Sequence, residues 1–472
     1  MWRQFGIKGT SKSIVCKVKH PADNSRSLHF LSDFPHLVKC TRNSVVSTGL
    51  QVPEGRVRID VVKEAWKCDN RDIVRLKAMP RVTRVVIEPN GFEKMKVNYA
   101  FTFFSDEIIR GLYAYREEIE RIWGTGSSKA TTCFIGRMAK LIAAMTSRCS
   151  RDAMRPSSPV LAEVKDFIAY LDAWEEEVGK LGFLSQGTAE GLRVTLASTM
   201  SILEYLTTKL GYKYLLTSRL SQDPLENVFG ILRQMSGSND HPTPTQFLLS
   251  ANCLSFCSLA KAPANGNVSP SMLKSLINGT CKDQGEVLKK LDELMDIGCL
   301  NEVNEILTSS GIPLDHSAIV SAKSYSRVIY YVTGYVARRM IRKTKCDECA
   351  KALIRPPDSE MPPDACLVTE VDRGGLIYPS NELHTFITKM EDSFTYCFSF
   401  SKLKANSIMD LISALARNRL NHVGCKQHST DVTNSLIKFY AMTRLHFIVK
   451  AENKAREGKR QRMRYLKLRR VT

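Results

Sequence analysis

Two carboxylates and a guanidinium, those of Asp223, Glu226 and Arg233, form the pattern in this sequence that best suits metal chemistry. Residues three apart on a helix lie on one face, so Asp223 and Glu226 would present their carboxylates together. Carboxylate oxygens bind divalent cations, and such cations catalyse phosphoryl chemistry on nucleic acids. The spacing therefore predicts a candidate metal site at the start of a helix, with Arg233 as a basic neighbour.

The same residues also fit a structural arrangement, the capping box. Asp223 would be the N-cap, Pro224 the first helical residue and Glu226 the residue that closes the box. An apolar face follows, formed by Leu225, Val228, Phe229 and Leu232, and Gly237 would end the helix. Spacing alone favours the cap, because capping boxes are common and metal sites are rare. Both roles can hold if Asp223 caps the helix while Glu226 points into a site.

Cysteines offer a second candidate for metal binding. Most of the 14 cysteines are scattered singly, which is typical of reduced thiols in the cytosol or nucleus. Cys346 and Cys349 have Cys-x-x-Cys spacing, and Cys366 and His384 are conceivable partners in a zinc site. One such pair without a second at zinc-finger spacing is a weak signal, so the sequence leaves zinc binding open.

The elements that position these residues are mostly helical. Short apolar runs near the N-terminus predict strands, followed by a helix over 35–46. Amphipathic patterns predict further helices over 101–119, 133–145, 164–181, 286–307, 406–420 and 431–449. Residues 263–270 read as a linker, because Pro, Asn, Gly and Ser cluster there. The chain has no run of about 18 apolar residues and no signal peptide, so we expect a soluble intracellular protein without a membrane partner.

A longer pattern surrounds Glu226. It consists of residues 216–226 (LTSRLSQDPLE), Phe229, Arg233 and residues 240–247 (DHPTPTQF). This pattern resembles the signature of the P-element-type DNA transposases, which include the THAP-domain transposase-like proteins. Similar segments recur in family order at 20–23, 30–39, 42–43, 94–97, 104–105, 334–339, 374–377 and 379–380. The resemblance thus extends over most of the chain, with stretches at 148–210 and 265–325 where none is recognised.

The resemblance implies a role for the two carboxylates. Glu226 stands at the last carboxylate of the family's RNase H-like catalytic triad, and Asp223 at an accompanying acidic position. In the intact family, two Mg²⁺ ions held by three carboxylates support DNA cleavage at the element ends and strand transfer. Met1 corresponds to an interior position of the RNase H domain, so we expect the first two catalytic Asp and the THAP zinc module to be absent from this amino-terminally truncated chain.

The resemblance also implies a helical insertion domain that binds GTP in the P-element transposase. The guanine-contacting Asp and Asn of the family align with Ala143 and Thr146. Alanine cannot accept a hydrogen bond from guanine, and the chain has no Gly-x-x-x-x-Gly-Lys-Ser/Thr loop. We therefore expect the insertion fold without dependable GTP binding.

The expected fold class is α+β and mostly helical. A partial RNase H-like domain is interrupted by a helical insertion domain of the GTP-binding type and followed by a helical C-terminal module. The expected domains are 1–50, the truncated first part of the RNase H-like domain; 51–205, the insertion domain; 206–262, the RNase H-like part with the Glu226 helix; 263–325, linker and helices; and 326–472, the C-terminal module with a basic tail.

The charge balance favours a polyanionic partner. Lys and Arg number 68 against 48 Asp and Glu, so the formal net charge is +20. The last 22 residues supply +7 of it, from nine Lys and Arg and two Glu. This tail suits a DNA-tracking arm or a nuclear localisation signal. Lys39 and Arg42, three apart on the helix over 35–46, could contact a DNA backbone, although solvated surface is the favoured role. The other candidate DNA contacts are Arg233, Lys459, Arg460, Arg462, Arg464, Lys467, Arg469 and Arg470.

Two functions remain open at this stage. The first is a P-element-like transposase that uses Mg²⁺ for DNA cleavage and strand transfer and is expected to be inactive as given. The second is a non-enzymatic, transposase-derived remnant that binds DNA or protein. We expect a nuclear location with either function, and a homo-oligomer is compatible with both.

Overall fold

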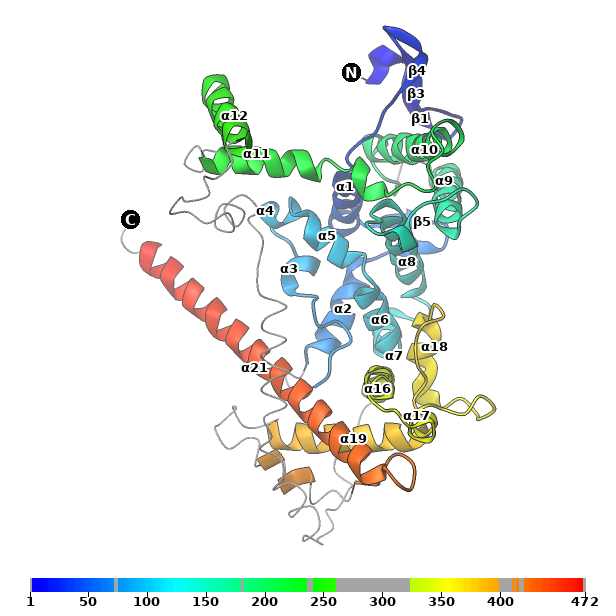
Figure 1. The fold of residues 1–472 in the computed structure, drawn as a ribbon, viewed down its shortest axis with the longest axis vertical. Coiled ribbons are helices and arrows are strands. Elements are labelled where there is room, and N and C mark those ends of the chain that lie inside the picture. Colours follow the sequence, from blue (N-terminus) through cyan, green and yellow to red (C-terminus); the bar gives the residue numbers. More distant parts are fainter. Residues whose placement is uncertain are drawn as a thin grey trace. The chain divides into compact units, whose positions relative to one another are not determined.

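A computed structural model describes residues 2–71, 75–179, 182–235, 241–259, 323–398, 410–411, 413–415 and 420–469 (Figure 1). Side chains are described for the same residues except 255–259, 323 and 450–469. Contacts divide the chain into two units. The first combines Met1–Thr217 with Ile306–Thr472, and the second is Ser218–Glu305.

The first unit begins with two antiparallel hairpins. Strand β1 (Lys8–Thr10) pairs with β2 (Ser13–Val15), and β3 (Lys17–His20) pairs with β4 (Asp23–His29). The hairpins lie against helix α10 (Gln186–Lys209). The hydroxyl of Ser198 on this helix lies within hydrogen-bond distance of two carbonyl oxygens, those of Cys16 and Phe30, and can donate to either. The expected order of strands followed by a helix is confirmed, because α1 (Phe34–Ser47) comes next. Asp33 Oδ2 caps α1 by accepting from the His36 amide at 3.2 Å.

The middle of the first unit is helical, apart from the hairpin β5 (Leu50–Val52) and β6 (Gly55–Val57). Its helices are α2 (Ile59–Asp69), α3 (Arg84–Ile87), α4 (Gly91–Lys94), α5 (Val97–Phe103), α6 (Asp106–Ala114), α7 (Arg116–Trp123), α8 (Lys129–Met145), α9 (Pro159–Val178) and α10. The helices expected over 133–145 and 164–181 correspond to α8 and α9. The single helix expected over 101–119 is wrong, because α5, α6 and α7 occupy that stretch.

Aromatic rings form the core between these helices. Phe104, Phe134 on α8 and Trp174 on α9 are buried and meet edge to face, with centroid separations of 6.2 and 5.6 Å. Phe103 is also fully buried, although it adjoins Phe104. Neighbouring residues on a helix are turned well away from each other. A break between α5 and α6 lets both rings reach the core.

The C-terminal part of the first unit packs around α19 (Asn381–Phe398). Its other described helices are α16 (Lys323–Ile341), α17 (Asp347–Leu353), α18 (Cys366–Val371) and α21 (Ser429–Arg469). Helix α21 confirms the helix expected over 431–449 and continues well beyond it. The helix expected over 406–420 lies largely outside the described residues, and the one over 286–307 lies wholly outside them.

A carboxylate lies at the centre of this C-terminal core. Glu391 is fully buried and accepts hydrogen bonds from the hydroxyls of Tyr325 and Tyr440. Arg444 donates to both of its oxygens, at 2.7 and 2.8 Å. These contacts tie α16, α19 and α21 together, so this carboxylate has a structural role.

Helix α16 also crosses a loop at very short range. A Cβ atom at Gly334 would lie 2.4 Å from the carbonyl oxygen of Ile377, so only glycine fits there. One turn further along, Arg338 donates to the carbonyl oxygen of Gly375. The C-terminal part is joined to the middle helices as well, through Ser324 Oγ, which donates to Glu118.

The second unit, as far as it is described, consists of α11 (Asp223–Met235) and α12 (Pro244–Leu259). The rings of Phe229 and Phe247 connect the two helices, with their centroids 5.7 Å apart. No helix among the described residues of the chain is long and apolar enough to cross a bilayer.

Candidate functional site

Helix α11 begins differently from the predicted capping box. The carbonyl oxygen of Gln222 accepts from the amides of Leu225 and Glu226, at 2.9 and 3.0 Å. Gln222 is therefore the N-cap, and Asp223 is the first helical residue. Ser221 Oγ accepts from the Asp223 amide at 3.0 Å. The predicted cap role of Asp223 is wrong, because Ser221 and Gln222 already bind the amides that a cap would satisfy.

The shift leaves the two carboxylates free for another task. Asp223 and Glu226 remain three residues apart on α11, so they share a face, and both are exposed. Within the described part of the chain, neither carboxylate has a hydrogen-bond or ion-pair partner. Arg233 is exposed two turns further along and forms no ion pair with Glu226. The helix start thus presents two adjacent, unpaired carboxylates, although α11 alone offers them no third acidic neighbour.

The apolar face predicted for α11 is only partly buried. Leu232 is 4% exposed, whereas Leu225, Val228 and Phe229 are 57%, 43% and 38% exposed. The three- and four-residue spacing of the apolar residues correctly indicated an amphipathic helix. It did not show how much of that face the second unit covers. Gly237, the predicted stop, lies outside the described residues.

Two residues predicted as DNA contacts or solvated surface are buried instead. Lys39 and Arg42 lie on α1, which packs against both α5 and α10. Arg42 donates to Asn43 Oδ1 and to the carbonyl oxygen of Lys94, at 2.9 and 3.0 Å, and burial lowers the pKa of its guanidinium. Both predictions are therefore wrong, because these side chains face neighbouring helices.

The basic tail is described only in its backbone. Helix α21 continues to Arg469, so it carries Lys459, Arg460, Arg462, Arg464, Lys467 and Arg469 on helical backbone. Their side chains, and Arg470 as a whole, lie outside the described residues. Contact of these residues with DNA stays a prediction.

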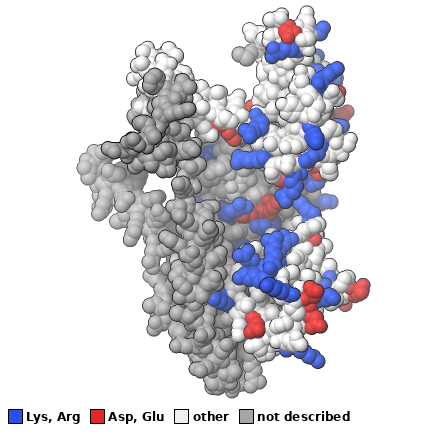
Figure 2. All heavy atoms as spheres, in the orientation of Figure 1, with Lys and Arg blue, Asp and Glu red and all other residues white. Residues whose placement is uncertain are grey.

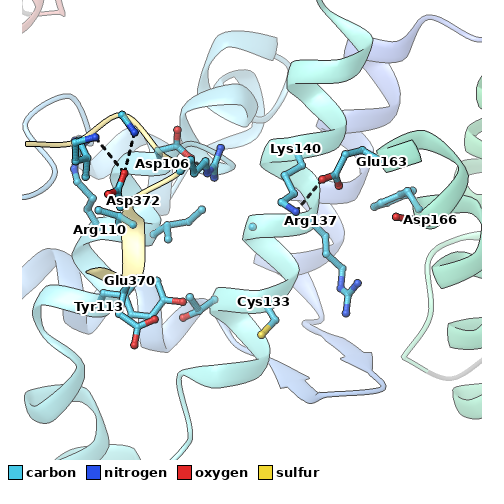
Figure 3. Close-up of a pocket in the computed structure, with 18 of the residues that line it drawn as sticks. Asp106, Arg110, Tyr113, Cys133, Arg137, Lys140, Glu163, Asp166, Glu370 and Asp372 are labelled. Atoms are coloured by element: carbon cyan, nitrogen blue, oxygen red, sulfur yellow. Dashed lines mark hydrogen bonds and ion pairs between the residues drawn. The ribbon is translucent and has the colours of Figure 1, made fainter. Parts of the chain in front are cut away.

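The first unit contains a pocket of about 690 Å³ between its middle helices and its C-terminal part. Residues of α6, α8 and α9 line one portion, and Tyr331, Glu370 and the 371–376 segment line another. Figure 3 shows Arg137 and Lys140 projecting from α8, with Glu163 and Asp166 across from them on α9. On the opposite side lie Asp106, Arg110 and Asp372.

The basic side chains of this pocket already have protein partners. Arg137 pairs with Glu54, Lys140 with Glu163 and Arg373 with Asp106. Arg110 donates to the hydroxyl of Tyr331 at 3.1 Å and stacks on its ring. These ion pairs are solvent-exposed, so each is weak and can exchange for another anion.

The positions aligned with guanine-reading residues lie near the end of α8. Ala143 is exposed, and Thr146 donates its hydroxyl proton to the carbonyl oxygen of Ile142 at 2.6 Å. Neither residue lines the pocket described above. Weak or absent recognition of guanine stays a prediction.

The Cys-x-x-Cys pair does have partners, but they are not the predicted ones. Cys346 and Cys349 lie beside Cys425 and His428, and one ligand atom from each falls within 4.8 Å of all the others. Cys366 is exposed, and the ring of His384 packs edge to face on Tyr330 with its centroid 5.0 Å away. Their suggested role as partners is therefore wrong. The Cys-x-x-His spacing of residues 425–428 was the available signal.

Comparisons with known proteins agree with the pattern around Glu226. The family described as "TNP-like, RNase H C-terminal domain" matches residues 218–249, which include α11 and the start of α12. The family described as "DNA transposase THAP9, C-terminal domain" matches residues 317–450. Together these matches cover the helix that carries Glu226 and most of the C-terminal part.

A curated relative extends the similarity along the chain. The "Transposable element P transposase" of Drosophila melanogaster is 26% identical over 479 residues, which cover 99% of this chain and 57% of the relative. The chain thus spans a little over half the length of that relative. The solved "Drosophila P element transposase strand transfer complex" is 24% identical, covers 53% of this chain and 55% of its own, and has a TM-score of 0.44. The resemblance of this chain to the P-element-type DNA transposases is confirmed by the family and sequence matches.

Proposed function

We propose that this chain is a P-element-like DNA transposase polypeptide whose Glu226 is a metal-binding carboxylate for DNA cleavage and strand transfer. The observation that carries the proposal is the unpaired, exposed pair Asp223 and Glu226, located in the segment that matches the RNase H C-terminal family. What favours a metal role over ordinary solvated surface is the position of Glu226 in the matched segment, on the same helix face as a second carboxylate.

The donor set of α11 fits part of a Mg²⁺ site. Glu226 would provide a carboxylate oxygen, and Asp223, three residues earlier, would provide an auxiliary one. A bound Mg²⁺ would activate water or a 3′-hydroxyl and stabilise charge on the phosphodiester. The role of the protein is to hold Glu226 on a rigid helix start, where the Ser221 and Gln222 hydrogen bonds fix the first turn.

Two carboxylates do not complete such a site, because Mg²⁺ prefers octahedral oxygen coordination and loses water reluctantly. Asp223 and Glu226 are the only acidic residues described between residues 218 and 259. We therefore propose that Glu226 works with carboxylates from other RNase H-like strands. Residues 1–472 by themselves are expected to show no DNA cleavage.

The test uses a polypeptide in which residues 1–472 follow the carboxylate-bearing strands of a P-element-type transposase. Glu226→Gln should abolish its Mg²⁺-dependent cleavage of DNA, because the amide keeps the size of the side chain but loses the charge that a metal requires. Asp223→Asn should reduce the rate partially. Glu204→Gln, an exposed change on α10, is the matched control. Cleavage by Glu226→Gln at the unmutated rate would overturn the assignment.

A second candidate function is non-enzymatic DNA binding, which the charge of the chain favours. Figure 2 shows Lys and Arg side chains spread over the visible face of the described residues, with fewer Asp and Glu between them. Such a surface attracts nucleic acid without reading its sequence. This function would not require Glu226.

Deletion of residues 451–472 tests how much of that binding the tail supplies. Nine basic residues would be removed, and each lost phosphate contact should flatten the plot of log affinity against log salt by about 0.9. Binding to unrelated DNA sequences should weaken alike. An unchanged slope would assign the tail to nuclear localisation instead. In that case a fluorescent fusion of the full chain should accumulate in the nucleus, and the same fusion without residues 451–472 should not.

The nucleotide question has its own experiment. We propose that this chain does not prefer GTP over ATP, because Ala143, at a position aligned with a guanine-reading residue, offers guanine no acceptor. Calorimetric titration of the full chain with each nucleotide should give no difference in affinity. Selective GTP binding would show that another group reads guanine.

A further inference from the structure

Four potential metal ligands converge in the C-terminal part of the first unit. Cys346 and Cys349 lie at the start of α17, and Cys425 and His428 lie in the turn that leads into α21. Cys349 Sγ is 3.4 Å from Cys425 Sγ, and Cys346 Sγ is 4.0 Å from the same atom. His428 Nδ1 is 3.3 Å from Cys425 Sγ. All four come from described residues, and none belongs to the α11 site.

The three separations from Cys425 Sγ lie near those of a tetrahedral zinc site. Zn–S bonds of about 2.3 Å and Zn–N bonds of about 2.0 Å place tetrahedral ligand atoms roughly 3.5–3.8 Å apart. The observed distances of 3.3, 3.4 and 4.0 Å lie around that range. Three sulfurs and one imidazole also form a common structural zinc set, in which all four positions are filled by protein.

A disulfide explains the cluster less well. A disulfide requires sulfurs about 2.05 Å apart, and the closest pair here is 3.4 Å apart. A bond between Cys349 and Cys425 would also leave Cys346 and His428 without a function. Each ligand pair, in contrast, has the two-residue spacing that allows one turn to present both of its members to one ion.

The surroundings hold the four side chains in place. Cys349 is fully buried and packs into the hydrophobic core with Leu353, Val423 and Val432. The turn that carries Cys425 and His428 closes through a hydrogen bond from the His428 amide to the Cys425 carbonyl oxygen, at 3.2 Å. It begins at Gly424, whose φ of 118° favours glycine.

Zinc binding would create a net negative charge at this cluster. Three thiolates and one Zn²⁺ carry a net charge of −1, after three thiol protons are released. Lys345 precedes Cys346, and Lys426 follows Cys425. Asp347 and Glu348 lie between Cys346 and Cys349, so the flanking charges balance. All four flanking side chains are exposed, and solvent can stabilise the charge of the cluster.

We propose that Cys346, Cys349, Cys425 and His428 bind a structural zinc ion that joins α17 to the start of α21. The ion links residues nearly 80 positions apart and completes a corner of the C-terminal core. With four protein ligands it has no open position for substrate, so it stabilises the fold and takes no part in DNA chemistry. The site is independent of the function proposed for Glu226.

The first experiment measures metal in the full chain, purified under reducing conditions. Elemental analysis should find about one zinc per chain, as a closed four-ligand site requires. Cys349→Ser, Cys425→Ser and His428→Ala should each weaken zinc binding by more than the ~10–100-fold that loss of an outer-shell partner costs. Cys366→Ser and His422→Ala, two exposed residues of the same part of the chain, should retain the metal.

A conservative variant separates ligand loss from misfolding. His428→Cys supplies a fourth thiolate and should keep zinc at the unmutated stoichiometry, whereas His428→Ala should not. Replacement of zinc by Co²⁺ in the unmutated chain should give a thiolate-to-cobalt charge-transfer band and the intense visible absorption of tetrahedral cobalt. Cys349→Ser should reduce the charge-transfer band, because one thiolate is lost.

Three results would overturn the proposal. The first is a reduced, folded chain that contains no zinc and gives no tetrahedral cobalt spectrum. The second is zinc that survives in Cys349→Ser and Cys425→Ser alike. The third is a disulfide between Cys349 and Cys425, detected by peptide mass analysis, in protein prepared with zinc and reductant present.

Discussion

Glu391 and Glu226 are the same residue type in opposite settings. Glu391 is fully buried in the C-terminal core and bound by two tyrosines and one arginine. Glu226 is exposed at the start of α11 and bound to nothing among the described residues. The first carboxylate has its hydrogen-bonding capacity filled by the fold, and the second is open to solvent. Protein partners therefore identify Glu391 as a structural acid, whereas Glu226 is distinguished from other exposed acids only by the segment in which it lies.

Removal of the Glu391 charge should produce the largest effect. Glu391→Gln leaves Arg444 buried without a counter-charge, which typically costs about 3–5 kcal/mol when a buried pair loses one partner. Chemical denaturation of the full chain, followed through the C-terminal part by limited proteolysis, would measure the loss. Glu382→Gln, exposed on the same helix, should cost at most about 1 kcal/mol. Similar losses of stability for Glu391→Gln and Glu382→Gln would mean that the buried carboxylate supports the fold no more than an exposed one does.

An intermediate effect is expected at the start of α11. Ser221→Ala removes the acceptor for the Asp223 amide and should cost about 1 kcal/mol, as loss of a capping hydrogen bond does. Asp223→Ala should cost less, within the ~0.3–1 kcal/mol of a charge near a helix N-terminus. Amide hydrogen exchange over residues 223–226 would report both changes. A larger cost for Asp223→Ala would restore its role as the cap.

The smallest effect on stability is expected for Glu226 itself. Glu226→Gln removes no contact among the described residues, so the free energy of unfolding should change by no more than about 0.5 kcal/mol. Thermal and chemical denaturation of the full chain without added metal would measure it. A loss near that of Glu391→Gln would mean that Glu226 supports the fold and is not reserved for a metal.

Sequence patterns predicted local features better than tertiary ones. Periodicity found α8, α9 and α21, because an amphipathic face is encoded within each segment. It missed the division of 101–119 into three helices, where Phe103 and Phe104 must both enter the core. It also missed the burial of Arg42, whose partner at Lys94 lies 52 positions away.

The two candidate sites show the same limit. The acidic pair on α11 was recognisable, because its spacing is local and its sequence context resembles a known family. The N-cap was predicted one residue too late, at Asp223 and not at Gln222. Ser221 and Gln222 accept the hydrogen bonds of the first amides of the helix in its place. Cys346 and Cys349 were identified, but Cys425 and His428 were not, because only the packing of α17 against the start of α21 brings the pairs together.

The close crossing at Gly334 has a consequence for how such a chain changes over generations. Two of the segments by which the resemblance was recognised, 334–339 and 374–377, meet there, and no side chain fits between Gly334 and Ile377. A substitution at Gly334 would disturb the fold, whereas a substitution at the exposed Glu226 would leave it intact. Descendants that lost DNA cleavage could therefore drift at Glu226 while keeping the glycine. Sequence signatures of this kind would outlast the activity with which they are associated.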